Sequence, residues 1–159
     1  DGKYDVVDGF PMGAVSFEDL KKYVSLSKLP FVVKGVLSVQ DALKARDAGC
    51  AGIVVSHHHG RLPFAIAPLE ILPKIKEAIG SSPMKIFVDC GMDMGYDAYK
   101  ALALGADAVS VGRGILPPLL KDGKEGVVKK MTRMNEELRE MMMYTGVKDM
   151  NSFDRTVLH

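Results

Sequence analysis

A histidine run and a nearby arginine are the residues in this chain best suited to do chemistry. His57, His58 and His59 directly follow the Gly-Ile-Val-Val-Ser segment 52–56, and Arg61 lies three residues after His58. An imidazole titrates near neutral pH and can accept a proton. A guanidinium offers two parallel donors to a carboxylate. Side chains of these two types can exchange a proton and hold an anionic group.

The elements that would position these residues alternate between apolar strands and amphipathic helices. We predict buried strands, the first of them ending at Gly35, over residues 29–36, 52–56, 84–89 and 107–111. Helices are predicted over residues 38–48, 68–79 and 96–104, with further helices after the last strand. Such alternation is typical of a parallel sheet, whose strands all end at one edge.

Polar and glycine residues follow three of these predicted strands. The histidine run follows the second strand, Asp89 and Gly91 follow the third, and Gly112 and Arg113 follow the fourth. Because parallel strands end at the same edge, we expect these residues to form one composite site there.

An internal repeat indicates how the units are arranged. Residues 41–45, Asp-Ala-Leu-Lys-Ala, resemble residues 97–101, Asp-Ala-Tyr-Lys-Ala, and glycines recur at the same offset. Paired strand–helix repeats build a β/α barrel, which takes about 250 residues for eight units. The 159 residues of this chain hold four units. They predict half of a barrel, completed by another segment or by a second copy, or cut from its other half. An independent doubly wound sheet remains the alternative.

The composition of the chain limits which classes of binding partner and which cellular compartment we expect for the protein. The net charge of +1 gives no basic surface for nucleic acid or an anionic membrane. No apolar run approaches the roughly 20 residues of a membrane span, and the N-terminus lacks the apolar core of a signal peptide. The two cysteines, Cys50 and Cys90, favour a reducing environment over a disulfide framework. We therefore expect a cytoplasmic protein without a membrane span or a nucleic-acid partner.

The three consecutive histidines also raise the question of a metal. Consecutive side chains on an extended segment point to alternate sides, so residues 57–59 do not all face one ion. No cysteine or carboxylate cluster lies nearby in the sequence. We predict no metal site, although one assembled from distant segments stays open.

These segments resemble the C-terminal half of the FMN-dependent α-hydroxy-acid oxidase and dehydrogenase family, which includes glycolate and lactate oxidases. The resemblance runs from about residue 29 to 145. It is most specific at residues 33–36, at 52–56 with His58 and Arg61, and at 100–109 running into Gly112 and Arg113.

This resemblance implies the C-terminal half of a (β/α)8 TIM barrel, with four parallel βα units and C-terminal helices. Residues 29–159 would form this half of an FMN-binding domain. Residues 1–28 would be a loop and helix leading into it. The rest of the barrel would come from a missing N-terminal half, and a homo-oligomer, commonly a tetramer in this family, is expected.

The resemblance also implies a reaction and its catalytic residues. In the family's scheme, His58 removes the hydroxyl proton of a 2-hydroxy acid while hydride passes from the α-carbon to flavin N5. Arg61 matches the arginine that binds the substrate carboxylate. Lys34 matches the lysine near flavin N1 and O2, where a fixed positive charge stabilises the reduced flavin. The product would be a 2-oxo acid.

The implied cofactor is FMN. The positions matching the family's FMN-binding segments are Lys34, Ser56, Asp89, Gly91, Gly112 and Arg113. Glycines allow backbone N–H groups to approach a phosphate closely, and Arg113 adds a fixed positive charge.

The chain departs from the family pattern at several positions around the site. Asp93 replaces an arginine expected to contact the flavin phosphate, and a carboxylate there repels the phosphate unless it points away. Leu62-Pro63-Phe64 replaces Gln-Leu-Asp after Arg61 and suits a larger or less polar substrate. His57 and His59 replace asparagine and glycine, so His59 adds bulk beside His58.

Other readings of the chain remain. It resembles, less specifically, other FMN-dependent barrels such as isopentenyl-diphosphate isomerase, which should not require the His58 and Arg61 pair. A half-barrel without catalytic activity that packs against itself or another chain is a second alternative. A proteolytic remnant of a longer protein is a third.

Overall fold

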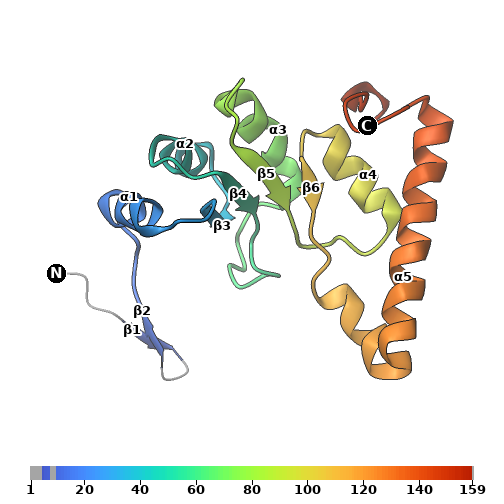
Figure 1. Cartoon of the computed structure of the whole chain (residues 1–159), viewed down its shortest axis with the longest axis horizontal. Helices are drawn as coiled ribbons and strands as arrows, with labels where there is room; N and C mark the ends of the chain where they lie inside the picture. Colours follow the sequence, from blue (N-terminus) through green and yellow to red (C-terminus); the bar gives the residue numbers. More distant parts are fainter. Residues whose placement is uncertain (1–4, 8–9, 159) are drawn as a thin grey trace.

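A parallel sheet with helices packed on one face forms the centre of the molecule (Figure 1). The computed structural model describes residues 5–7 and 10–158, so the predicted N-terminal segment 1–28 lies partly outside the described residues. Within them, the sheet has the strands β3 (Val32–Val36), β4 (Gly52–Val55), β5 (Lys85–Val88) and β6 (Ala108–Val109). The helices α2 (Val39–Asp47), α3 (Pro68–Ile79) and α4 (Gly95–Ala103) connect them in turn.

Further elements lie at both ends of the chain. Before the sheet come an antiparallel pair, β1 (Asp5–Val7) and β2 (Phe10–Met12), and the helix α1 (Phe17–Leu26). After it come the short 3-10 helix η1 (Arg113–Ile115), the long helix α5 (Leu116–Thr145) and a second 3-10 turn, η2 (Arg155–Val157). The predicted succession of four strand–helix units followed by C-terminal helices is confirmed.

The strands follow their sequence order across the sheet and all run in parallel. The order is β3-β4-β5-β6, and Ile53 of β4 lies opposite both Val33 of β3 and Ile86 of β5. A parallel connection needs a crossover, which each helix provides. This arrangement brings the carboxyl ends of the strands to one edge, as the sequence predicted for a partial (β/α)8 barrel.

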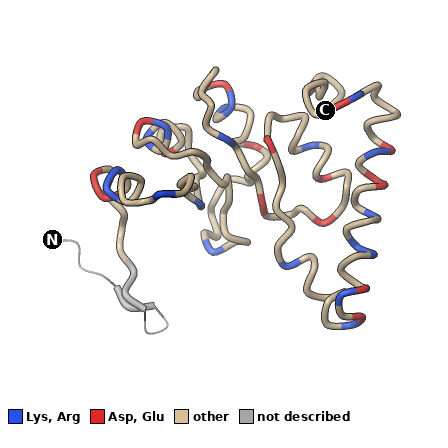
Figure 2. The backbone as a smooth tube through the Cα atoms, viewed as in Figure 1, with Lys and Arg blue, Asp and Glu red and all other residues tan. Residues whose placement is uncertain are grey.

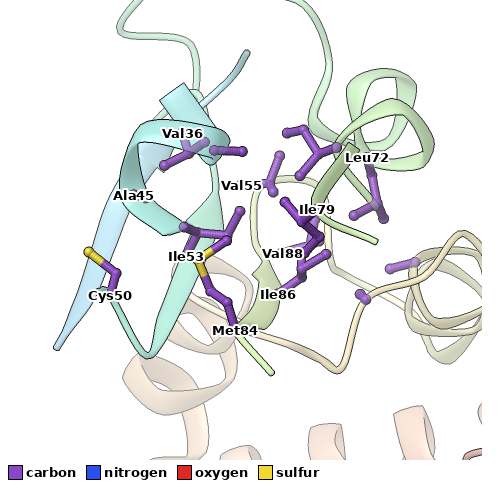
Figure 3. Packing of buried hydrophobic residues seen from close by; sticks show 14 of the residues in the cluster. Val36, Ala45, Cys50, Ile53, Val55, Leu72, Ile79, Met84, Ile86 and Val88 are labelled. Atoms are coloured by element: carbon purple, nitrogen blue, oxygen red, sulfur yellow. The ribbon is translucent and has the colours of Figure 1, made fainter. Parts of the chain in front are cut away.

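The apolar core lies between the sheet and its covering helices. Ile53 and Val55 of β4 and Ile86 of β5 are 0 % exposed, and they pack beside Leu72 of α3 and Ala45 of α2 (Figure 3). Side chains alternate across a strand, so Val54 and Phe87 point to the other face. That second face is only partly buried. One covered and one open face is what half of a barrel wall would show.

The outermost strands differ from the predicted buried strands. Val32 of β3 is 41 % exposed, because β3 pairs with β4 alone among the described strands. Gly35 does not end this strand: it has φ +94° and lies at a register irregularity between Lys34 and Val36. A bulge of this kind re-aims the neighbouring side chains. The last strand, predicted over 107–111, pairs over Ala108 and Val109 only, and the chain then turns away.

Helix starts and stops agree well with the sequence signals. Ser38 is the N-cap of α2, and its hydroxyl accepts a hydrogen bond from the Asp41 N–H at 3.0 Å. Helices α2 and α4 are followed by Gly49 and Gly105, with φ of +87° and +108°. These two glycines occupy the same offset in the internal repeat, so the two units turn from helix to strand alike.

A buried carboxylate fastens the long C-terminal helix α5 to the start of helix α4. Glu137 of α5 is 8 % exposed and accepts a hydrogen bond of 2.7 Å from the Gly95 N–H at the start of α4. Arg133, one turn earlier, donates to the same carboxylate at 2.8 Å. The backbone is so close that a Cβ on Gly95 would lie 2.1 Å from the Met134 carbonyl oxygen. The contact therefore requires glycine at this position.

Charge is spread over the surface without a dominant sign. Lys, Arg, Asp and Glu are interspersed along α1, α2 and α5 (Figure 2). Among the described residues, no helix combines the length and apolar character needed to cross a membrane.

We expect Glu137→Gln to make stability less dependent on pH. The hydrogen bond from the Gly95 N–H, followed by the Arg133 contact, lowers the Glu137 pKa, with burial acting in the opposite direction. The carboxylate's contribution is therefore complete above the ordinary glutamate pKa and is lost as pH falls through the folded-state value. Near neutral pH the variant should lose about 1 kcal/mol in urea unfolding.

The neighbouring Glu136→Gln provides the matched control, because Glu136 is exposed on the same helix. The loss caused by Glu137→Gln should shrink on acidification, whereas the control should stay close to the wild type. A loss of equal size at every pH would contradict this role of the carboxylate.

Candidate active site

One lysine side chain connects three neighbouring strand ends. Lys34 of β3 extends its Nζ to the Ser56 hydroxyl, 2.9 Å away at the end of β4, and pairs with the Asp89 carboxylate at the end of β5. Ser56 is 1 % exposed, whereas the Lys34 side chain is 49 % exposed. Lys34, Ser56 and Asp89, all predicted as cofactor-binding positions from the family resemblance, are thus joined in one network.

The Asp89 carboxylate is held in its ionised form. Burial would raise its pKa, but hydrogen bonds from Cys90 and Lys34, together with the lysine charge, outweigh this and lower it. The network therefore keeps an anion and a cation adjacent at neutral pH and in mild acid.

The histidine segment turns sharply above this network. The Ser56 hydroxyl accepts the His58 N–H at 3.1 Å, and His57 Nδ1 accepts the Gly60 N–H at 3.0 Å. His58 and His59 have φ of 51° and 57°, so the segment is a left-handed turn and not the extended stretch assumed from the sequence. Non-glycine residues adopt this conformation at a cost, and such strain is concentrated at functional sites.

Cys90 ties this turn to the network. It too has a positive φ, 69°. Its Sγ lies 3.0 Å from Asp89 Oδ1, and it accepts a hydrogen bond from the backbone N–H of His59, with a distance of 3.2 Å between sulfur and nitrogen. Here the side chain does more than fill space, because it connects two segments of the site.

A pocket of about 440 Å³ opens at this edge of the sheet. The segments that follow β4 and β6 both extend to the lower side of the sheet in Figure 1, and both contribute lining residues. Its walls are formed by Lys34, His58, His59, Asp89, Cys90, Gly91, Met92, Asp93, Ser110, Gly112, Arg113 and Gly114.

Most residues predicted for the site meet in this pocket. Lys34, His58, Asp89, Gly91, Gly112 and Arg113 all line it. Ser56 lies buried beneath, hydrogen-bonded to Lys34. Arg61 is the exception: it is exposed on the loop that carries His58 and is not among the lining residues.

Two pocket features were missed from the sequence. Ser110 lines the pocket directly after β6, but the strand predicted over 107–111 contained it, so the rule that polar residues follow strand ends did not identify it. Asp93 forms an ion pair of 2.7 Å with Lys130 of α5. No local pattern signals that pair, because its members are far apart in the sequence.

The described residues contain no group of three or more His, Cys, Asp and Glu side chains that could hold a metal ion.

A second hollow, also about 440 Å³, lies between α1 and β3, and apolar residues such as Phe17, Tyr23 and Val32 contribute much of its lining.

Comparison with known proteins places this geometry in a family. The model of the FMN-dependent dehydrogenase family matches residues 2–159. An L-lactate oxidase from Roseobacter sp. (strain GAI101) is 37% identical over 147 residues, and human 2-hydroxyacid oxidase 1 is 39% identical over 146 residues. These alignments cover 92% and 91% of this chain.

Solved structures of similar fold support the same family assignment. A mandelate oxidase variant with a monooxide FMN adduct superimposes with a TM-score of 0.84 at 38% identity, over 91% of this chain and 46% of that one. The chain belongs to the FMN-dependent dehydrogenase family. It spans about two-fifths of the length of the curated relatives, 40% of the lactate oxidase and 39% of the human enzyme.

The pocket fits the cofactor of this family. Gly91 and Gly112 present no side chain to it, and a Cβ added at either would meet no atom within 4 Å, so the backbone is open to a ligand there. Lys34 and Arg113 place positive charges among the lining residues, where an anionic flavin or its phosphate can be held.

We expect a thiol reagent to distinguish the two cysteines. Cys90 lines the pocket, whereas Cys50 is 6 % exposed in the core, and burial raises the pKa of its thiol. Because the thiolate is the reactive form, iodoacetamide should modify Cys90 first in the native protein. Peptide mass spectrometry would measure the two rates. Cys90→Ala should remove the fast phase, and fast labelling of Cys50 would contradict the assignment.

Proposed function

We propose that the protein containing this chain oxidises a 2-hydroxy acid to a 2-oxo acid with FMN. The observation that carries the proposal is one pocket lined by His58 together with Lys34 of β3, Asp89 after β5 and Arg113 of η1. Family membership and relatives named lactate, 2-hydroxyacid and mandelate oxidases support it.

Two residues of one loop would handle the substrate. The guanidinium of Arg61 binds the substrate carboxylate, and its exposed position leaves it free to reach a ligand. His58 takes the proton of the α-hydroxyl onto its imidazole. FMN, when bound, supplies the acceptor for the hydride that leaves the α-carbon. The proton and the hydride together account for the two hydrogens lost by the substrate.

The strand-end network would serve the cofactor. Lys34 supplies a fixed positive charge beside the pocket and stabilises negative charge that develops on the cofactor. We assign cofactor binding to Lys34, Ser56, Asp89, Gly91, Gly112 and Arg113. Ser56 and Asp89 act by holding the lysine in place, since both contact its ammonium group.

We further propose that residues 29–159 are the C-terminal half of a barrel and that residues 1–28 lead into it. Within the described sheet, β3 pairs only with β4 and β6 only with β5, so two strand edges remain for partners. An N-terminal half of four further βα units would cover these edges and the partly exposed inner face. We also propose a homo-oligomer that works in the cytoplasm.

Two substitutions test the proposed reaction in the FMN-loaded protein. Anaerobic addition of lactate, glycolate or mandelate should bleach the visible flavin absorbance. His58→Gln should lower kcat about 100- to 10,000-fold while the flavin remains bound. Arg61→Lys should raise KM about tenfold, because an ammonium cannot form the bidentate contact.

Arg46→Lys is the matched control for Arg61, because Arg46 pairs with Asp47 on the surface of α2. It should leave both constants unchanged. The proposal would be overturned if no 2-hydroxy acid bleached the bound flavin, or if Arg61→Lys left KM and kcat unchanged. Either result would favour a different FMN-dependent reaction.

A further inference from the structure

An ion pair at one end of the pocket is not explained by the proposed chemistry. Asp93 lines the pocket, and its Oδ1 lies 2.7 Å from Nζ of Lys130 on α5. The Lys130 side chain is 21 % exposed, whereas that of Asp93 is 65 % exposed. Asp93 is thus a lining residue of the pocket, whereas its partner Lys130 on α5 is not.

The carboxylate stands beside the pocket's glycine-rich turn. A Cβ built on Gly114 would lie 2.7 Å from Asp93 Oδ1, so the carboxylate packs directly against that backbone. Arg113 precedes Gly114 and also lines the pocket. Asp93 and Arg113 thus border the same end of the pocket, on two different strand-end segments.

The two ends of the pocket differ in how their charges are compensated. The lining residues include the cations Lys34 and Arg113 and the anions Asp89 and Asp93. Lys34 is paired with Asp89 and Asp93 with Lys130, whereas Arg113 takes part in none of the ion pairs found among the described residues. The Arg113 end is therefore where an anionic group of a ligand finds an uncompensated positive charge.

We infer that the Asp93–Lys130 pair sets how strongly the pocket discriminates between phosphorylated and unphosphorylated ligands. The inference rests on the proposed FMN site. A phosphate at the Arg113 end is repelled by the Asp93 carboxylate and attracted by its partner Lys130. Asp93 thus weakens phosphate binding and Lys130 offsets part of that weakening. The binding of a ligand whose end at this position is neutral does not depend on the charge of either side chain.

The test compares FMN with riboflavin, which has the same ring but no phosphate. Quenching of flavin fluorescence on binding gives both dissociation constants for each purified protein. Asp93→Asn should tighten FMN binding about tenfold and leave riboflavin unchanged. Lys130→Met should weaken FMN binding about tenfold, again without affecting riboflavin. Raising the salt concentration should reduce these differences.

Matched variants separate a local effect from a change of net charge. Asp47→Asn makes the same charge change at the end of α2, and Lys129→Met makes it on the exposed neighbour of Lys130. Both should bind FMN and riboflavin like the wild type. The double variant Asp93→Asn, Lys130→Met should depart from additivity, because the two side chains are in contact.

The possible results are distinguishable. Equal shifts for FMN and riboflavin in Asp93→Asn, or no shift at all, would overturn this inference while leaving the flavin site intact. Shifts as large in the surface controls would also overturn it. If the wild type binds neither flavin, the proposed function itself fails. A thermal melt of each variant shows whether it has kept its fold before binding is measured.

Discussion

The placement of one ammonium group organises the site. Lys34 contacts Ser56 and Asp89, so three adjacent strands are tied together at their carboxyl ends. Ser56 in turn accepts the His58 N–H at 3.1 Å, and Cys90 links Asp89 to the same histidine turn. The proposed cofactor-binding lysine and the backbone of the proposed base thus belong to one hydrogen-bonded unit.

The sheet makes this convergence possible, and only part of its surface is covered by the described residues. Parallel strands bring Lys34, Ser56 and Asp89 to one edge, and buried residues such as Ile53 and Ile86 fix the register that aligns them. The inner face of the sheet and its outer edges are less well covered. In the described residues, strand ends and loops line the pocket. Further strands would enclose it.

Much of this fold could be predicted because its signals are local. The cap at Ser38, the glycines that follow helices and the apolar runs identified the units. The order of polar residues after strands, with the family resemblance, identified six of the twelve residues that line the pocket. What could not be predicted depends on contacts between distant segments. Lys130 reaches Asp93 across 37 positions, and Glu137 reaches Gly95 across 42. The left-handed turn at His58 also escaped prediction, because a positive φ is uncommon for any residue other than glycine.

The central claim is that separate strand ends form one flavin pocket. Hydrogen exchange of the purified protein, measured by mass spectrometry with and without FMN, tests it most directly. The account predicts slower exchange on FMN addition in the segments around Lys34, His58, Asp89–Met92 and Ser110–Gly114 together. Slower exchange confined to the hollow between α1 and β3, with these four segments unchanged, would contradict it.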